Sequence, residues 1–340
     1  MGRQTGNTRQ GDERRNDSLA RAFLRALSAA EEFEGATAPN PPVGCVLLDV
    51  DGIELAAAGH RKAGELHAEA AAIGLARERG VGDRIHTVVV TLEPCNHMGR
   101  TPPCAEAILS TPAREVWIGV TDPNHAVTGD GTGRLLAAGL NVEFVEELRH
   151  ADAVKLHAAA QRLIAPFAKR VTTSLPWVTV KQAVARNGSM VPPAGQKTFT
   201  SASSLLLAHQ LRKRADAVLT GSGTVLADSP KFTVRHVPDF ARKQRTLVIL
   251  DRRRRVPADY LDAATLRGFD VRVEDTLLEA LQRLGSHGAL EVLVEAGPAL
   301  TQQVLNSGLW DEHYLIEQGA ANGGDRISIR TPNNSIHCSS

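Results

Sequence analysis

The sequence predicts an α/β protein made of two domains. Strand-like runs of Val, Ile and Leu alternate with helical patterns along the chain, which is typical of layered α/β folds. The alternation ends in a long helical segment and restarts near Trp177, and no repeat relates the two halves. The length of 340 residues also exceeds the roughly 100–200 residues of an average domain.

Apolar periodicity and Gly, Pro and Asp turn residues define the elements expected in the first half. In chain order these are a helix over 19–30, strands over 43–48 and 54–59, a helix over 67–79, a strand over 87–92, a helix over 103–110, a strand over 115–120, a helix over 133–138 and a strand over 141–145. This order predicts a three-layer α/β domain over 18–148, followed by a connecting helix over 149–170.

The second half repeats the alternation with different elements. We expect strands over 178–184, 216–220, 246–251, near 271 and over 290–295, and helices over 203–214, 277–284 and 300–307. These elements predict a second α/β domain over 171–318.

Both ends of the chain lack such patterns. Residues 1–17 are polar and mixed in charge, without the apolar segment of a secretory signal, so we expect a disordered leader. Residues 319–340 lose periodicity and are rich in Asn, Ser and Thr, so we expect an irregular tail.

Composition argues against several classes of partner. A net charge of +1 and an aromatic content of 4% disfavour non-specific nucleic-acid binding. No run reaches the roughly 18–20 apolar residues that span a bilayer, so no membrane partner is expected. Four cysteines in so long a chain do not form a disulfide framework, which favours a reducing cytoplasm.

One constellation in the first half indicates a zinc site: His67, Glu69, Cys95 and Cys104. One imidazole and two thiolates suit zinc and leave its fourth position open for water. Bound zinc lowers the pKa of that water to about 7, and Glu69 is expected to shuttle its protons. The pattern matches zinc-dependent nucleobase deaminases, although the second cysteine comes nine positions after the first rather than three.

The spacing constrains where these residues lie. Residues two apart on a helix face away from each other, so His67 has to lie at or just before the first helical turn, which the loop around Gly64 permits. Cys104 follows Pro103 at another helix start, where the dipole favours a thiolate. Cys95 follows a strand end, where α/β folds usually place chemistry.

Less specific explanations stay open. A His-x-Glu pair alone is common on helices, and Cys95 and Cys104 could be small buried residues or a loop disulfide. A purely structural zinc would make the chain a binding module, but no fourth ligand is apparent beside Cys104. A deaminase that edits nucleic acid is a further alternative, disfavoured by the low aromatic content and the neutral charge.

The loop Cys-Asn-His-Met-Gly-Arg-Thr-Pro-Pro-Cys over 95–104 resembles that of the bifunctional riboflavin-biosynthesis deaminase/reductase family. Further matches are Pro39-Asn40-Pro41, Val43-Gly44-Cys45-Val46, His60 and Asp122-Pro123-Asn124, and the resemblance covers about residues 18–311.

The resemblance implies a cytidine-deaminase-like first domain. His67, Cys95 and Cys104 would bind zinc, and Glu69 would act as acid and base in hydrolytic deamination of a diaminopyrimidinone ribosylamine phosphate. Four polar residues are expected to contact the base and phosphate, with a loop hydrogen-bonding role as the equal alternative for each: Asn40, His60, His97 and Arg100.

The residues of the second half are less specific by themselves. Gly221-Ser222-Gly223 lacks the third glycine of a dinucleotide fingerprint. The arginines at 252–255 could hold a 2′-phosphate, or form a solvated turn.

Matches over 211–212, 220–230, 233–235 and 294–300 resemble the reductase domain of the same family. They imply a dihydrofolate-reductase-like fold that uses NADPH to reduce the ribosyl group. Expected cofactor contacts are Val184, Thr224, Asp228, Gly297, Pro298, Ala299 and Leu300. Expected substrate contacts are Arg212, Phe232, Arg235 and Glu295.

Some positions depart from the family pattern. Asn187 and Gln196 differ from it, and after Asp311 the usual Pro-x-x-x-Gly segment and two final strands are not recognisable. We therefore expect a truncated reductase sheet and weak NADPH binding.

Together these observations predict a cytoplasmic, homo-oligomeric bifunctional enzyme that uses zinc and NADPH on a small-molecule pyrimidine ribotide. The alternative is a deaminase paralogue from a related pathway, such as that of an azapteridine toxin, with a weak or inactive reductase half.

Overall fold

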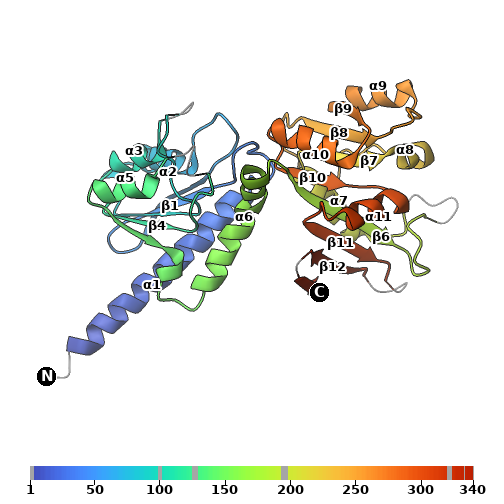
Figure 1. The fold of residues 1–340 in the computed structure, drawn as a ribbon. Coiled ribbons are helices and arrows are strands. Elements are labelled where there is room, and N and C mark those ends of the chain that lie inside the picture. The colour runs from blue at the N-terminus through green and yellow to red at the C-terminus, as the bar shows by residue number, and fades with distance from the viewer. Residues whose placement is uncertain are drawn as a thin grey trace. The chain divides into compact units, whose positions relative to one another are not determined.

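A computed structural model describes residues 4–98, 102–124, 129–192, 198–319, 324–332 and 334–339 (Figure 1). The chain divides into two compact units, Met1–Thr172 and Thr173–Ser340. No helix within these described ranges has the length and apolar content to cross a membrane.

The first domain contains a five-stranded sheet in the order β2-β1-β3-β4-β5. Its strands are β1 Gly44–Leu48, β2 Glu54–Gly59, β3 Thr87–Val90, β4 Glu115–Ile118 and β5 Asn141–Phe144. β1 pairs antiparallel with both β2 and β3, whereas β3, β4 and β5 are parallel. Since β2 and β3 therefore run in the same direction, their carboxyl ends lie at the same edge of the sheet.

Helices cover both faces of this sheet. The helices are α1 Gln4–Glu31, α2 Ala68–Glu78, α3 Cys104–Leu109, α5 Gly131–Ala137 and α6 Ala153–Thr173, with short 3₁₀ turns at Gly82–Arg84 and Val145–Glu147. Val46 and Leu48 pack with α1 and α6, while Cys45 and Leu47 pack with α2, α3 and α5. This alternation along β1 produces two apolar layers, and the predicted three-layer α/β domain is confirmed.

Two glycines bring α1 onto the sheet. A Cβ added at Gly44 would lie 1.9 Å from the Ala26 carbonyl oxygen, and one at Gly59 would lie 2.1 Å from that of Ala29. The α1 backbone can approach β1 and β2 so closely only because these positions carry no side chain.

The prediction that residues 1–17 form a disordered leader is wrong from Gln4 onward, because helix α1 begins at that residue. Arg15 forms an ion pair with the buried Glu115, and Asp17 lies 3.4 Å from His150. These partners are about 100 or more positions away in sequence, so the polar composition of the leader did not reveal them. The helix over 149–170 is also more than a connection, because α6 packs into the first core.

The second domain contains an eight-stranded sheet in the order β13-β12-β11-β6-β10-β7-β8-β9. Its strands are β6 Trp177–Val184, β7 Ala217–Gly221, β8 Arg245–Leu250, β9 Phe269–Glu274, β10 Glu291–Val294, β11 Glu312–Glu317, β12 Arg326–Thr331 and β13 Asn334–Ser339. All neighbours from β11 to β9 are parallel, and β12 pairs antiparallel with both β11 and β13.

Helices also cover both faces of the second sheet. They are α7 Ala202–Arg214, α8 Ser222–Asp228, α9 Ala258–Leu266, α10 Leu277–Ser286 and α11 Pro298–Ser307. Leu219 and Val292 pack with α10 and α11, whereas Val218 and Leu247 pack with α8 and α9. Leu293 packs with Leu211 of α7.

The expected truncation of this sheet, and the irregular tail over 319–340, are corrected by the structure. Strands β11, β12 and β13 extend the sheet beyond β6. On β12 the buried side chain is Ser328, whereas Ile327 and Ile329 are partly exposed. The sequence of β12 therefore lacks the pattern of buried apolar residues by which a strand is usually predicted. Helix α9, which follows Pro257, was also not predicted.

We expect Gly44→Ala to lower the free energy of unfolding by about 1–3 kcal/mol, because the added methyl group overlaps the α1 backbone. Gly74→Ala is the matched control: no atom lies within 4 Å of a Cβ placed there, so alanine in α2 should stabilise by about 0.5–1 kcal/mol. Urea denaturation followed by circular dichroism measures both. Equal stability of Gly44→Ala and wild type would contradict the packing of α1 on β1.

Candidate functional site

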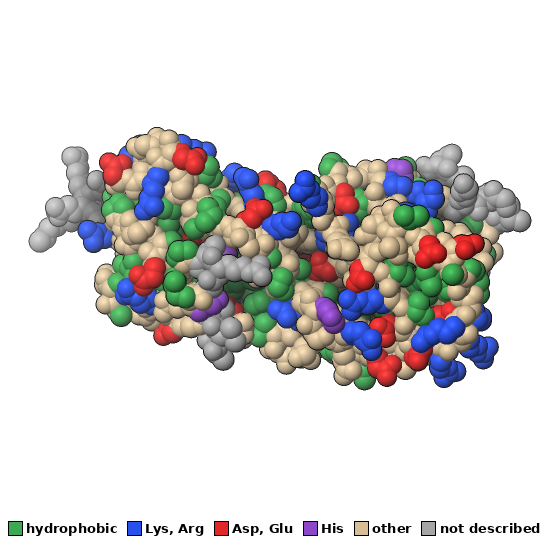
Figure 2. All heavy atoms as spheres, turned by 90° about the horizontal axis from the view of Figure 1, so that it is seen from above, with side chains coloured by type: hydrophobic (Ala, Val, Ile, Leu, Met, Phe, Trp, Pro, Cys, Tyr) green, Lys and Arg blue, Asp and Glu red, His purple; other side chains and the backbone are tan. Residues whose placement is uncertain are grey.

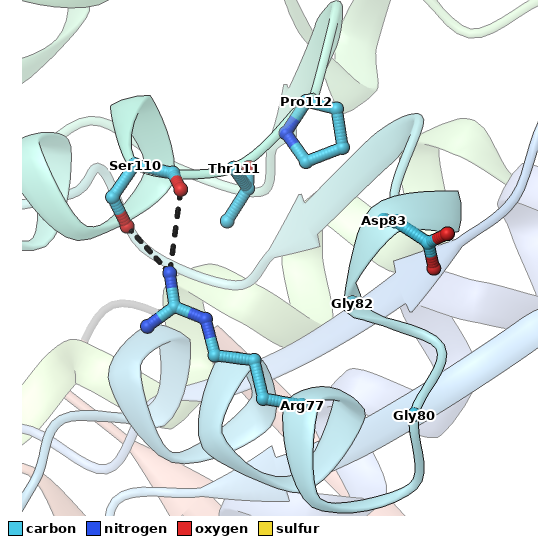
Figure 3. Close-up of a pocket in the computed structure, with 7 residues that line it drawn as sticks. All are labelled: Arg77, Gly80, Gly82, Asp83, Ser110, Thr111 and Pro112. Carbon is cyan, nitrogen blue, oxygen red and sulfur yellow. Dashed lines mark hydrogen bonds between the residues drawn. The ribbon is translucent and has the colours of Figure 1, made fainter.

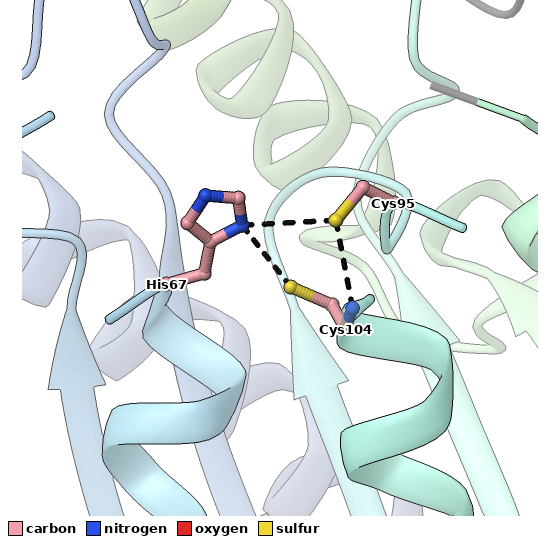
Figure 4. Close-up of side chains that lie close together, drawn as sticks. All are labelled: His67, Cys95 and Cys104. Atoms are coloured by element: carbon pink, nitrogen blue, oxygen red, sulfur yellow. Dashed lines mark hydrogen bonds between the residues drawn. The ribbon is translucent and has the colours of Figure 1, made fainter. Parts of the chain in front are cut away.

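Three side chains far apart in sequence converge at one point of the first domain. The ligand atoms of His67, Cys95 and Cys104 lie within 4.8 Å of one another. His67 Nδ1 is 3.2 Å from Cys104 Sγ and 3.7 Å from Cys95 Sγ. Figure 4 shows the imidazole and both thiols pointing toward one another.

These distances fit a tetrahedral zinc ion. With Zn–S near 2.3 Å and Zn–N near 2.0–2.1 Å, tetrahedral geometry separates a sulfur from a nitrogen ligand by about 3.5 Å. The two observed nitrogen–sulfur distances bracket that value. Three protein ligands leave a fourth position for water or substrate, as in catalytic zinc sites.

The fold brings each ligand to the same edge of the sheet. His67 is the residue that precedes α2, in extended conformation, after a loop in which Gly64 has a φ of 88°. Cys104 is the first residue of α3, directly after Pro103. Cys95 follows the carboxyl end of β3, and its carbonyl accepts the Ala105 N–H at 3.1 Å. The placements expected from the spacing are confirmed.

The side chains of His67, Cys95 and Cys104 change one another's pKa. Hydrogen bonding from Cys104 lowers the pKa of Cys95 to about 4, and His67 adds to this effect. The hydrogen bond to Cys95 raises the pKa of His67. For Cys104, the interaction with the Cys95 thiolate and burial raise the pKa. One thiolate is thus stabilised before any metal binds, and zinc would displace the proton of the second.

Glu69 lies in the first turn of α2 and is only 3% exposed. Burial raises its pKa, and its carboxyl group is within hydrogen-bonding reach of Cys104. A carboxyl group held beside the ligand set is placed to exchange protons with a molecule bound at the open metal position.

The residues expected to contact the base differ in their surroundings. His60 is buried; its Nδ1 donates to the Leu66 carbonyl (3.0 Å), and its Nε2 accepts from the Asn40 amide (3.2 Å). Burial lowers the pKa of His60. Both nitrogens are therefore used within the protein, and His60 supports the loop before His67. The Nδ1 atom of His97 is buried and has no hydrogen-bond partner among the described residues. Arg100 lies outside the part of the chain that the structure describes.

In the second domain, a buried carboxylate is paired with two cations. Glu295, directly after β10, forms a bidentate pair with Arg212 of α7 at 2.5 and 2.8 Å, and Lys181 of β6 lies 3.1 Å away. Burial alone would raise the pKa of Glu295, but the charges and hydrogen bonds of Lys181 and Arg212 outweigh it and lower the pKa to about 2. The carboxylate is therefore ionised at neutral pH.

Two of the neighbouring predicted contacts, Arg212 and Arg235, lie beside His209. Its Nδ1 accepts the Arg235 N–H at 3.1 Å, and burial together with Arg212 lowers its pKa to about 4. The Arg235 side chain is exposed. The Phe232 side chain is buried among Val225 and Leu247, so a substrate contact at this position has to come from its backbone.

The predicted cofactor residues lie at the carboxyl ends of the adjacent parallel strands β6, β10 and β7. Val184 ends β6, Thr224 Oγ1 accepts the Gly297 N–H at 2.9 Å, and a Cβ at Gly221 would lie 3.1 Å from Leu300 Cδ2. The exposed residues Pro298 and Ala299 open α11. Ligands of open α/β sheets bind at such an edge. Asp228 is exposed at the end of α8.

Two of the four arginines over 252–255 stabilise the turn that follows β8. Arg254 pairs with Asp275 at 2.9 Å, and Arg255 donates to Ser222 Oγ at 2.7 Å. Arg252 and Arg253 are exposed, and the described part of the chain offers them no hydrogen bond or ion pair.

Asn187 and Gln196 are the two positions of the second half at which the sequence departs from the family pattern. Asn187 lies in a hydrogen-bonded turn after β6 in which Gly188 has a φ of 78°, and its side chain accepts the Ser189 N–H. Gln196 lies outside the described residues.

A pocket of about 420 Å³ lies away from the zinc-ligand set (Figure 3). It is lined by Arg77, Gly80, Gly82, Asp83, Ser110, Thr111 and Pro112. Arg77 and Ser110 belong to the carboxyl-terminal ends of α2 and α3, whose amino-terminal ends carry His67 and Cys104. The ten positions from His67 to Arg77 along α2 span about 15 Å and the six from Cys104 to Ser110 about 9 Å, so this pocket is not the reaction centre.

Charges of both signs are mixed on one face of the molecule. On the face drawn in Figure 2, acidic and basic side chains are interspersed over the described surface, as expected from a net charge of +1.

Lys181 and His209 were not predicted from the sequence. Lys181 stands inside a strand of the central part of the second sheet, where both faces are covered and residues are normally apolar. The presence of a lysine in such a strand was the feature of the sequence that could have indicated a functional residue. His209 lies on a helix whose sequence gave no indication that its imidazole is buried.

Two family models match the chain. The model of the cytidine and deoxycytidylate deaminase zinc-binding region matches residues 17–120, and that of the RibD C-terminal domain matches residues 176–333.

Individual proteins are similar over most of their length. The riboflavin biosynthesis protein RibD of Bacillus amyloliquefaciens is 36% identical, over 85% of this chain and 81% of its own. The solved structure of Acinetobacter baumannii RibD, form 1, is 31% identical with a TM-score of 0.76, covering 91% of this chain and 88% of that one. A Thermotoga maritima diaminohydroxyphosphoribosylaminopyrimidine deaminase/5-amino-6-(5-phosphoribosylamino)uracil reductase is 28% identical with a TM-score of 0.77, covering 91% and 89%.

We expect the purified protein to contain one zinc ion per chain, because a single set of three ligand atoms is found among the described residues. Cys104→Ala should lose most of the metal, whereas Cys45→Ala should retain it, because Cys45 is a buried cysteine of β1 that lies outside the ligand set. Elemental analysis of the three proteins decides this. Full metal content in Cys104→Ala would remove Cys104 from the ligand set.

Proposed function

Because the chain belongs to the RibD family of riboflavin-biosynthesis deaminase/reductases, we propose that it carries out both reactions of that family. The first domain would deaminate diaminohydroxyphosphoribosylaminopyrimidine, and the second would reduce 5-amino-6-(5-phosphoribosylamino)uracil with NADPH. These are the two compounds named for the similar Thermotoga maritima enzyme.

The convergence of His67, Cys95 and Cys104 beside the buried Glu69 carries the deaminase proposal. Zinc held by these ligands supplies an activated water. Glu69 would take one proton from that water as its oxygen adds to the amine-bearing ring carbon, and deliver it to the ring nitrogen. It would then carry the proton of the new hydroxyl group to the amine, so that the C–N bond breaks and ammonia departs. The unpartnered Nδ1 of His97 supports a contact with the substrate, as do Asn40 and Arg100 by family resemblance.

In the second domain, Arg212, Arg235 and Glu295 are proposed to bind the substrate, with the Phe232 backbone beside them. We add Lys181 to this proposed substrate site, because it contacts Glu295. NADPH supplies the hydride. Val184, Thr224, Asp228 and 297–300 would hold it at the strand edge, with Arg252 and Arg253 available for its 2′-phosphate.

The toxin-pathway alternative with a degenerate reductase half is not favoured. The expected loss of the last strands was its structural basis, and β12 and β13 are present. Free thiols at Cys45, Cys95 and Cys104 support a reducing cytoplasm as the location. The absence of a nucleic-acid partner and the homo-oligomeric state stay predictions.

Glu69→Gln tests the deaminase proposal directly. The amide cannot shuttle a proton, so ammonia release from the aminopyrimidine ribotide should fall by at least about 10²-fold to 10⁴-fold. Zinc content should not change, because Glu69 is not a ligand. Near-normal turnover by this variant would remove Glu69 from the mechanism.

We expect a strong preference for the phosphorylated pyrimidine ribotide over free cytosine and over single-stranded DNA. Family membership and the interspersed surface charge are the reasons. Ammonia release from each compound under the same conditions makes the comparison. Deamination of cytosine in an oligonucleotide, with none of the ribotide, would overturn the proposed substrate.

In the reductase half, Glu295→Gln should abolish most NADPH oxidation by the deaminated product and lower the stability of the domain by about 3–5 kcal/mol, because Arg212 and Lys181 lose a buried partner. Glu317→Gln is the control: its pair with Arg326 is exposed, so the change should be within about 1 kcal/mol. Absorbance of NADPH and urea denaturation report the two effects. Unchanged turnover in Glu295→Gln would exclude it from the site.

A further inference from the structure

Glu93 is a buried carboxylate two residues before Cys95, and none of the functions described above uses it. Its side chain is 5% exposed. Its backbone N–H donates to the Val120 carbonyl at 2.9 Å. One carboxylate oxygen accepts the Asp122 N–H at 3.1 Å, and the other accepts the Thr132 N–H at 3.2 Å. Glu93 thus joins the loop after β3 to the loop after β4 and to the first turn of α5.

Such an arrangement needs a carboxylate in particular. A buried polar group is costly unless it is hydrogen-bonded, and a carboxyl side chain can offer an acceptor oxygen to each of two N–H groups. Both oxygens of Glu93 face backbone N–H groups. A glutamine would place an NH₂ group against one of these N–H donors, so that the donor would lose its acceptor.

This segment approaches the backbone of two neighbouring elements closely. A Cβ added at Gly119 would lie 2.5 Å from the Thr91 carbonyl oxygen, and one at Gly131 would lie 1.8 Å from that of Pro94. The chain from Thr91 to Pro94 is therefore enclosed between the end of β4 and the start of α5. Glu93 supplies the hydrogen bonds to the same two elements.

Cys95 follows this enclosed segment directly. Pro94 restricts the backbone between Glu93 and Cys95. Beyond that point, Cys95 bonds to α3, through its carbonyl oxygen to Ala105 N–H and through Sγ to Cys104 N–H at 3.5 Å. Metal–ligand distances tolerate deviations of only about 0.2 Å, so the sulfur has to be held from both sides.

We propose that Glu93 is the positioning residue of the zinc site: it fixes the Cys95 loop against the β4–α5 side, and so holds the Cys95 sulfur at the metal. It is not itself one of the three metal ligands. The inference rests on the proposed zinc function of His67, Cys95 and Cys104.

The test compares Glu93→Gln with Glu106→Gln in the zinc-loaded full-length protein. Glu106 is a matched control, because it is an exposed carboxylate of α3 that also reaches α5, through Arg134 at 2.7 Å. We expect Glu93→Gln to lose zinc to a chelator 10- to 100-fold faster than wild type, a range typical when a group that orients a metal ligand is changed. Its kcat for ammonia release should fall, with KM within about twofold. Glu106→Gln should match wild type within about twofold in each measurement.

Cobalt substitution gives a readout independent of activity. In Glu93→Gln the thiolate-to-cobalt absorption should shift or weaken, since the Cys95 sulfur is displaced, and in Glu106→Gln it should be unchanged. Zinc release and a cobalt spectrum like those of wild type would overturn the positioning role. A Glu93→Gln chain that does not fold would also overturn it, in favour of a general stabilising role. If wild type itself bound no zinc, the proposed function would fail instead, and the two failures are therefore distinguishable.

Discussion

A tetrahedral metal requires its ligand atoms to lie about 3.5 Å apart, and the arrangement of the first domain follows from meeting that requirement with residues 37 positions apart. Antiparallel pairing of β1 with both β2 and β3 places the carboxyl ends of β2 and β3 at one edge. The segment after β2 can then start α2 beside the loop after β3. His67 precedes the first turn of α2 and Cys104 opens α3, so these two ligands come from the starts of helices, where backbone direction is well defined.

The second domain gathers charge at a strand edge without a metal. Glu295 follows β10, Lys181 projects from the neighbouring β6, and Arg212 comes from α7. Each ion by itself would be costly to bury, and together they compensate one another. Because one carboxylate is shared by two cations, the cluster keeps a net positive charge. That charge suits a phosphorylated substrate, and the buried partners hold the cations in fixed positions before the substrate arrives.

The sequence predicted every strand of the first sheet, because a strand depends on the apolar pattern of neighbouring residues. It predicted the zinc set because the residue types and the loop over 95–104 identify the ligands, although these are up to 37 positions apart. Long-range contacts were not accessible in this way. The helical order of residues 4–17 depends on pairs such as Arg15 with Glu115, and β12 buries Ser328 rather than an isoleucine. Family resemblance likewise suggested a substrate contact for His60, yet both of its ring nitrogens are bonded within the protein. A motif identifies which residues matter, whereas their hydrogen bonds decide what each one does.

The nine-residue separation of the two cysteines changes how the metal site has to be built. With a spacing of three, both thiols belong to one turn, and local backbone geometry fixes their separation. Here Cys104 is positioned by α3, while Cys95 belongs to the preceding loop. Its sulfur is therefore set by contacts with other elements, namely the Ala105 and Cys104 N–H groups on one side and the segment anchored by Glu93 on the other. Under the proposed positioning role of Glu93, the longer loop leaves the Cys95 sulfur to be held in part by a carboxylate that lies outside the ligand set.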